Sequence, residues 1–176
     1  MESMIVLGLE LVGIIAFAVS GAATAAEKDI FGVVFIGVIN ALGGGVIRDI
    51  LLGIFPPIMF TYKVYAIVSI VSSLFVFLFA YNDTDRFLGN LENIDNFVNI
   101  FDAIGLGIFS VTSIQRCINF GYVDNAFLCI LMSMTTGIGG GIMRDLLCQK
   151  LPAVLRKRIY ALAAIAGGTI YYYMFK

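Results

Sequence analysis

The sequence predicts an all-helical protein that crosses a membrane several times. Of its 176 residues, 60% are hydrophobic and only 13% are charged, with a net charge of −1. A soluble domain carries about 25% charged residues, so this chain has too few to cover a surface exposed to water. Two further observations support a membrane protein: the chain contains six long apolar stretches, and one unusual segment occurs twice.

Composition also excludes several functions. The chain has no histidine, which is the commonest general base and metal ligand. Cys117, Cys129 and Cys148 are too far apart to form a CxxC pair, so neither a zinc site nor a disulfide framework is expected. Without a basic face the chain is not expected to bind nucleic acid. We therefore expect neither an enzyme nor a resident metal.

Six stretches are long enough to span a bilayer, for which about 20 residues are needed. They cover Met4–Ala26, Ile30–Ile54, Val64–Tyr81, Val98–Ile114, Val123–Leu147 and Ile159–Phe175. The first begins without positive charges and is too long for the core of a signal peptide, so it is expected to be a span. The expected organisation is a three-helix repeat (1–81), a polar linker (82–97) and a second three-helix repeat (98–176).

The ends of the spans indicate an orientation. Tyrosines such as Tyr62, Tyr65 and Tyr81 lie near span ends and are expected to form an interfacial belt. On the side of the amino terminus, here called side A, the expected loops and chain end contain Lys63, Arg116 and Lys176. The opposite side, side B, contains Lys28, Arg86, Lys150, Arg156, Lys157 and Arg158. This excess predicts a cytoplasmic side B, because loops rich in Lys and Arg stay inside.

A segment of the second span recurs in the fifth. Ala41–Leu52 (ALGGGVIRDILL) matches Gly137–Cys148 (GIGGGIMRDLLC), and Glu10–Ser20 matches Asp102–Thr112. Because each repeat holds three spans, the second copy enters the membrane from the opposite side. Inverted repeats of this kind are typical of transport proteins. A duplicated bundle with a purely structural role is the alternative.

The recurring segment contains three consecutive glycines. These are Gly43, Gly44 and Gly45 in the first repeat and Gly139, Gly140 and Gly141 in the second. Glycine disfavours a helix by about 1 kcal/mol relative to alanine. Small residues also let membrane helices pack closely, but usually at a spacing of four, so contiguous glycines favour a kink or break. Freed carbonyls would then coordinate a cation, and Asn40 and Thr136, one turn earlier, would line its path.

Charged pairs follow each triplet. Arg48–Asp49 and Arg144–Asp145 lie three residues after the glycines. Charges inside a membrane usually face the protein interior or water, although arginine near a span end also reaches the lipid interface. The repeat predicts two equivalent pairs, Glu10–Arg48 and Asp102–Arg144. We expect them to line or close the two mouths of a pathway.

These motifs resemble a known family. The paired GGGxxRD segments, and the E/D-x-x-G-x-x-x-F-x-x-S/T opening of each repeat, are similar to the prokaryotic branch of the trimeric intracellular cation (TRIC) channels, some of which are also described as glycine transporters. The resemblance implies a homotrimer in the cell membrane, with one pore per protomer and an amino terminus on the non-cytoplasmic face. It implies kinks at Gly43–Gly45 and Gly139–Gly141. The family usually has a seventh helix, and because this sequence stops at Lys176, we expect either that the sequence is truncated or that this helix is missing.

Two functions from different classes follow from the same site. The first is a channel for potassium or other monovalent cations, with no cofactor beyond the permeant potassium or sodium ion and with a bound lipid left open. The second is a secondary transporter of glycine or another small zwitterion, in which helix ends hold the charged groups. A non-conducting scaffold is a third alternative, and an enzyme has the least support.

Overall fold

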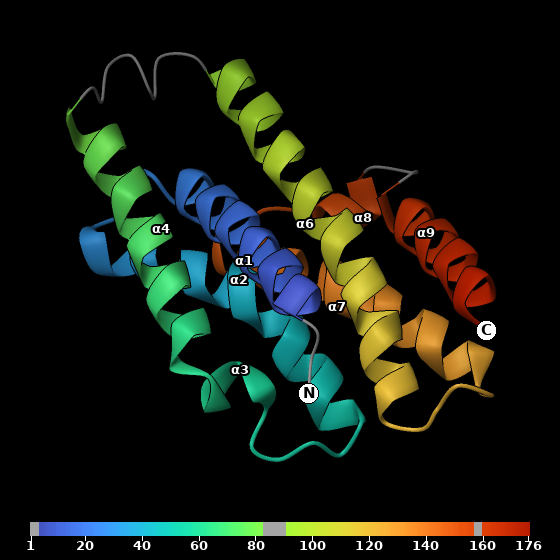
Figure 1. Cartoon of the computed structure of the whole chain (residues 1–176). Coiled ribbons are helices and arrows are strands. Elements are labelled where there is room, and N and C mark those ends of the chain that lie inside the picture. The colour runs from blue at the N-terminus through green and yellow to red at the C-terminus, as the bar shows by residue number, and fades with distance from the viewer. Residues whose placement is uncertain (1–3, 83–90, 157–159) are drawn as a thin grey trace.

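The computed structural model describes residues 4–82, 91–156 and 160–176, and every regular element in these ranges is a helix (Figure 1). The expected fold class, an all-helical multi-pass membrane protein, is confirmed. The long helices are α1 (Met4–Thr24), α2 (Ile30–Leu51), α4 (Lys63–Asn82), α6 (Leu91–Asn119), α7 (Ala126–Leu147) and α9 (Tyr160–Phe175). Two four-residue helices, α3 (Ile58–Thr61) and α8 (Ala153–Arg156), follow α2 and α7.

The lengths of the spans differ in part from those expected. Among the described residues, five helices are long and apolar enough to cross a membrane. The sixth expected span corresponds to α9, whose 16 residues extend about 24 Å at 1.5 Å per residue, less than the roughly 30 Å of hydrocarbon. Helix α6 begins at Leu91, inside the polar stretch expected to be linker. Arg86, Lys157 and Arg158, which contribute to the charge bias of side B, lie outside the described residues.

The helices form two equivalent halves around a central group. Helices α1 and α2 contact α6 and α7 in the centre, and Figure 1 shows α4 and α9 on opposite flanks. Helix α4 packs against α1 and α2, just as α9 packs against α6 and α7. Phe17 and Phe109 hold equivalent repeat positions, and their rings stack with centroids 5.4 Å apart and planes 9° from parallel. The two halves therefore meet through the same residues.

Small residues let the outer helices approach the inner ones. A Cβ on Gly37 of α2 would overlap the Ser73 hydroxyl of α4, and one on Gly168 of α9 would overlap the Ser133 hydroxyl of α7. The second contact is the repeat equivalent of the first, with glycine and serine exchanged between the inner and outer helix. Close packing of this kind holds helices together in lipid, where the hydrophobic effect contributes little.

The ends of α2 and α7 are also matched. Asp29 Oδ1 accepts a hydrogen bond from the Gly32 amide at 2.9 Å, and Asn125 Oδ1 accepts one from the Leu128 amide at 3.0 Å. These N-caps satisfy amide groups that have no partner within the helix. At the other ends, Gly53 (φ 73°) and Gln149 (φ 56°) take left-handed conformations at equivalent positions. Glycine adopts this conformation readily, whereas glutamine does so at a cost.

Replacing Gln149 with glycine is expected to stabilise the protein. The left-handed conformation costs a residue with a Cβ about 1–2 kcal/mol, and glycine loses about 0.5–1 kcal/mol in backbone entropy. The free energy of unfolding should therefore rise by roughly 0.5–1 kcal/mol, seen as a higher melting temperature in detergent. Gly53→Ala at the matched turn should lower it. Equal changes of the same sign at the two turns would contradict this account.

Candidate functional site

The glycine triplets lie where α2 and α7 cross at the centre of the bundle. Both helices are continuous through the triplets, so the expectation of a break is wrong, whereas a kink at the glycines stays a prediction. A Cβ on Gly44 would overlap the carbonyl oxygen of Thr136, and one on Gly140 would overlap that of Asn40. The glycines are needed because each helix lies directly against the backbone of the other. A packed neighbour replaces the break that local propensity suggested.

The outer glycines of the triplets contact other groups. A Cβ on Gly139 would lie 3.3 Å from the Cα of Gly44, whereas one on Gly43 would meet only the flexible end of Met143. Gly45 faces the side chain of Met59, which is fully buried. Gly141 is buried. The triplets therefore make one tight backbone contact at their centre, flanked by methionine side chains.

Asn40 and Thr136 occupy equivalent positions but bond differently. Asn40 Nδ2 donates to the Phe17 carbonyl at 2.6 Å, which ties α2 to α1. Thr136 Oγ1 donates to the Met132 carbonyl of its own helix at 2.7 Å. Both residues are buried, and the Asn40 Oδ1 atom has no hydrogen-bond partner. The Thr136 and Asn40 carbonyl oxygens face the opposing glycines, while the Asn40 side-chain oxygen lacks a partner, and cation binding at these residues stays a prediction.

The Arg-Asp pairs are buried and organised in the same way in both repeats. Arg48 Nε donates to Asp49 Oδ1 at 2.9 Å, and Arg144 Nε donates to Asp145 Oδ1 at 2.8 Å. The other carboxylate oxygen of each aspartate accepts a backbone amide at the start of the next short helix, from Ile58 at 2.9 Å and from Ala153 at 2.8 Å. Each aspartate therefore neutralises its neighbouring arginine and holds the following loop against the helix end.

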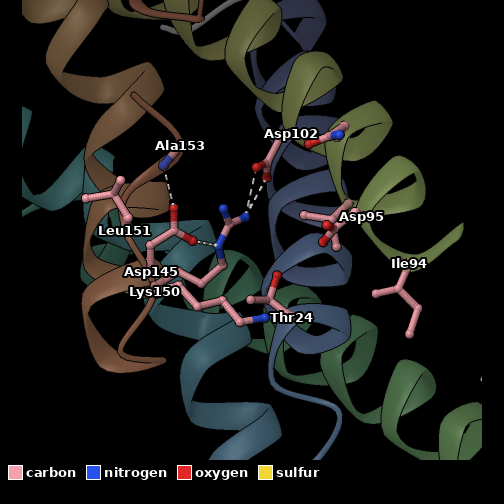
Figure 2. A pocket seen from close by; sticks show the side chains of 11 residues that line it. Thr24, Ile94, Asp95, Asp102, Asp145, Lys150, Leu151 and Ala153 are labelled. Atoms are coloured by element: carbon pink, nitrogen blue, oxygen red, sulfur yellow. Dashed lines mark hydrogen bonds and ion pairs between the residues drawn. The ribbon is translucent and has the colours of Figure 1, made fainter. Parts of the chain in front are cut away.

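On side B, the expected pair is formed. Arg144 Nη1 donates to both carboxylate oxygens of Asp102, at 2.8 and 2.9 Å, and Figure 2 shows these bonds across the pocket. The Ser20 hydroxyl also bonds Asp102, and Arg144 Nη1 donates to Ser20 at 2.7 Å. A helix from the first repeat thus completes the pair made by the second. We call Asp102, Arg144 and Ser20 the side-B triad.

A small polar cavity adjoins the side-B triad. Its volume is about 40 Å³, and it is lined by residues that include Thr24, Asp95, Asn99, Asp145 and Lys150. In Figure 2 the Lys150 side chain reaches toward Thr24, with Asp95 on the facing helix. A neighbouring cavity of about 290 Å³ shares Thr24, Asp95 and Lys150 and adds Glu27. Water and small ions therefore have room beside the triad on side B.

On side A, the expected Glu10–Arg48 pair is not formed in the described conformation. Glu10 is fully buried, but its Oε1 accepts a hydrogen bond from Arg116 Nη2 at 2.7 Å, and its Oε2 accepts one from the Tyr65 hydroxyl. Arg48 Nη1 and Nη2 have no hydrogen-bond partner, although Nη2 lies 2.7 Å from Asp49 Oδ1. The Thr112 hydroxyl, equivalent to that of Ser20, also lacks a partner. The same parts that form the side-B triad are therefore present on side A but not joined.

Sequence reasoning missed two residues of this cluster. Arg116 was expected in a loop, and Tyr65 in the interfacial belt, yet their exposed fractions are 5% and 0%. The repeat offered one signal, because Arg116 aligns with Thr24 and therefore breaks the symmetry with an added charge. Tyr65 offered no such signal.

The remaining candidates for chemistry are the cysteines and any group of side chains that could hold a metal ion. Within residues 4–82, 91–156 and 160–176, no group of three or more histidines, cysteines or acids is placed to hold a metal ion. Burial raises the pKa of the Cys148 thiol, an effect that Lys150 and Lys28 partly offset. A thiol of this kind is a weak nucleophile at neutral pH.

Adding one methyl group at the centre of the glycine contact should destabilise the bundle. Gly44→Ala and Gly140→Ala both direct a Cβ into a backbone carbonyl that cannot move by itself. Overpacking of this type costs about 1–3 kcal/mol, measurable by thermal unfolding. Gly43→Ala meets only the flexible end of Met143 and should cost less, and Gly107→Ala, with no atom within 4 Å, is the control. Equal losses at all four positions would contradict a specific contact.

The two hydroxyls at equivalent positions should differ in their contribution to stability. Ser20→Ala removes the hydroxyl that bonds both Asp102 and Arg144 inside the bundle, and should cost about 1–3 kcal/mol. Thr112→Val removes a hydroxyl that has no partner and should be nearly neutral. Thermal unfolding of the two variants provides the comparison. A larger loss for Thr112→Val would show that side A is bonded as side B is.

Comparison with known proteins places this arrangement in a family. The sequence profile of the family described as "Glycine transporter" matches residues 7–81 and 99–176. The UPF0126 membrane protein YvgT of Bacillus subtilis is 39% identical over 164 residues, which are 92% of this chain and 77% of that protein. The UPF0126 inner membrane protein YadS of Escherichia coli K12 is 33% identical in an alignment 177 positions long, gaps included, which covers 98% of this chain and 81% of that protein.

Solved structures agree with the sequence relatives. The TRIC trimeric intracellular cation channel orthologue from Rhodobacter sphaeroides matches with a TM-score of 0.86 at 32% identity, over 98% of this chain and 84% of that one. A prokaryotic TRIC channel matches with a TM-score of 0.86 at 39% identity, over 97% of this chain and 84% of that one. The chain therefore belongs to the prokaryotic TRIC channel family, whose sequence profile is the one described as a glycine transporter.

Proposed function

We propose that this protein is a channel for monovalent cations, chiefly potassium. The observation that carries the proposal is the agreement of the whole fold with TRIC cation channels at up to 39% identity. The buried charges support it, since ionisable groups inside a membrane protein usually mark an ion or substrate pathway. Glu10, Arg48 and Asp49 lie toward side A, and Asp102, Arg144 and Asp145 lie toward side B.

The proposed route runs along α2 and α7, between the two charged clusters. At its centre the Gly44 and Gly140 backbones lie against the opposing helix, so the route is closed in this conformation. Conduction then requires the two helices to separate or rotate. Four buried side-chain oxygens without partners, in Asn40, Ser110, Thr112 and Ser113, would supply ligands to a partly dehydrated cation. This differs from coordination by freed backbone carbonyls, because those carbonyls remain within continuous helices.

Assembly and location follow from the relatives. The Rhodobacter sphaeroides protein is named a trimeric channel, and YadS is named an inner membrane protein. We propose a homotrimer in the inner or plasma membrane with one pore per protomer. Arg116 is buried in an ion pair with Glu10, so it is not a loop charge on side A. Its removal from the loop count strengthens the bias toward a cytoplasmic side B and a non-cytoplasmic amino terminus.

Glycine transport is the second candidate. The family description supports it, and both candidates would use the same inverted repeats. Each charged cluster contains both signs of charge, as recognition of a zwitterion requires. The two candidates differ in what crosses the membrane and at what rate.

Purified protein in liposomes should distinguish the two functions. We expect unitary currents that reverse at the potassium equilibrium potential, and expect Gly140→Leu to abolish them because the leucine side chain would occupy the route that opens between α2 and α7. Gly167→Ala, with no atom within 4 Å of its added Cβ, is the matched control and should conduct normally. Gel filtration checks that the variants are assembled. Saturable uptake of labelled glycine without such currents would overturn the channel in favour of the transporter.

A further inference from the structure

The two charged clusters contain equivalent residues that are hydrogen-bonded differently. On side B, Asp102 is bonded by Arg144 and by the Ser20 hydroxyl. On side A the equivalent residues are Glu10, Arg48 and Thr112. Arg48 and Thr112 are both at least 99% buried, yet Arg48 Nη1 and Thr112 Oγ1 have no hydrogen-bond partner, whereas Arg48 Nη2 lies 2.7 Å from Asp49 Oδ1. Leaving donors unpaired in the interior of a membrane protein is costly.

On side B the equivalent two groups, Arg144 Nη1 and the Ser20 hydroxyl, share the carboxylate of Asp102, so a carboxylate is the partner that Arg48 Nη1 and Thr112 lack. Glu10 holds the position equivalent to Asp102, and Arg48 holds the position equivalent to Arg144. Glu10 is also one methylene longer than aspartate. Its carboxylate is held elsewhere by Arg116 and Tyr65. Arg116 has no equivalent on side B, where the aligned residue is Thr24, so only side A has this competing cation.

We infer that Glu10 exchanges partners between two states of the protein. In the state described here, Arg116 and Tyr65 hold it. In the other state, Glu10 joins Arg48 and Thr112 in a side-A triad that matches the triad on side B. Arg116 is then a positioning residue that sets the balance between the states. The exchange keeps the total charge of the cluster unchanged, because Glu10 remains paired with one guanidinium in each state.

Thermal double-mutant cycles test the exchange without any transport measurement. Glu10→Gln, Arg48→Gln and the double variant are made in the full chain, and again in an Arg116→Gln background. If Arg116 competes for Glu10, its removal transfers Glu10 to Arg48. The non-additive part of the melting-temperature change should then at least double in the Arg116→Gln background. An equal or smaller non-additive part would overturn the inference.

Substitution of Thr112 provides an independent test of the exchange. Thr112→Val should leave the melting temperature nearly unchanged in the wild type but lower it in the Arg116→Gln background, where the hydroxyl gains a partner. Ser113→Ala is the matched control, because the Ser113 hydroxyl is also buried and unpartnered but does not align with Ser20. It should behave alike in both backgrounds. A Thr112→Val variant that is silent in both backgrounds contradicts the exchange.

A second background guards against an unstable Arg116→Gln variant. Tyr65→Phe removes the other bond to Glu10 while keeping Arg116, and should raise the Glu10–Arg48 coupling by a smaller amount in the same direction. An unchanged coupling in this background also counts against the exchange. Since the cycles measure unfolding alone, absent potassium currents with intact coupling would reject the proposed channel and leave the exchange standing.

Discussion

The contact between the backbones of α2 and α7 is the constraint on which the rest of the structure depends. Gly44 lies against the Thr136 carbonyl and Gly140 against the Asn40 carbonyl, so any larger residue at either glycine would separate the helices. Each repeat thus contributes one glycine and one carbonyl to the contact, so the two repeats meet in the same way at the centre of the bundle. Glycine weakens each helix by about 1 kcal/mol per residue, and close packing between the helices offsets that cost.

Because backbone atoms fill the centre of the bundle, the buried charged groups lie toward its two ends. There the Arg-Asp sequence acts locally: each aspartate neutralises its neighbour and also bonds the amide that starts the next short helix. Each buried guanidinium thus has a partner on its own helix, independent of contacts with other helices. This reduces the cost of keeping an arginine inside the membrane, which otherwise amounts to several kcal/mol. It also leaves the remaining edge of each arginine free to bond a second carboxylate.

The free edge of the guanidinium bonds a second carboxylate at one end of the bundle but not at the other. Asp102 occupies it on side B, whereas Glu10 on side A is held by Arg116. Inverted repeats in transport proteins commonly work by such non-equivalence, since a change on one side has a ready counterpart on the other. Polar cavities adjoin side B, beside Asp95 and Lys150. In the described conformation the glycine backbones of α2 and α7 are in contact, and both of these polar cavities lie on side B.

Much of this arrangement follows from the sequence alone, because it depends on local properties. Hydropathy determines the apolar helices, and the offset copies of GGGxxRD determine two oppositely oriented halves, the placement of the charges toward the two ends of the bundle and the Asp102–Arg144 pair. Only the tertiary structure decided whether the triplets break the helices or bring them together. A glycine run permits both, and the choice depends on what lies opposite, here a backbone about a hundred residues away in the chain. The same reason hid the partner of Glu10: Arg48 and Arg116 are both within its reach, and their relative distances are set by how α1, α2 and α6 pack.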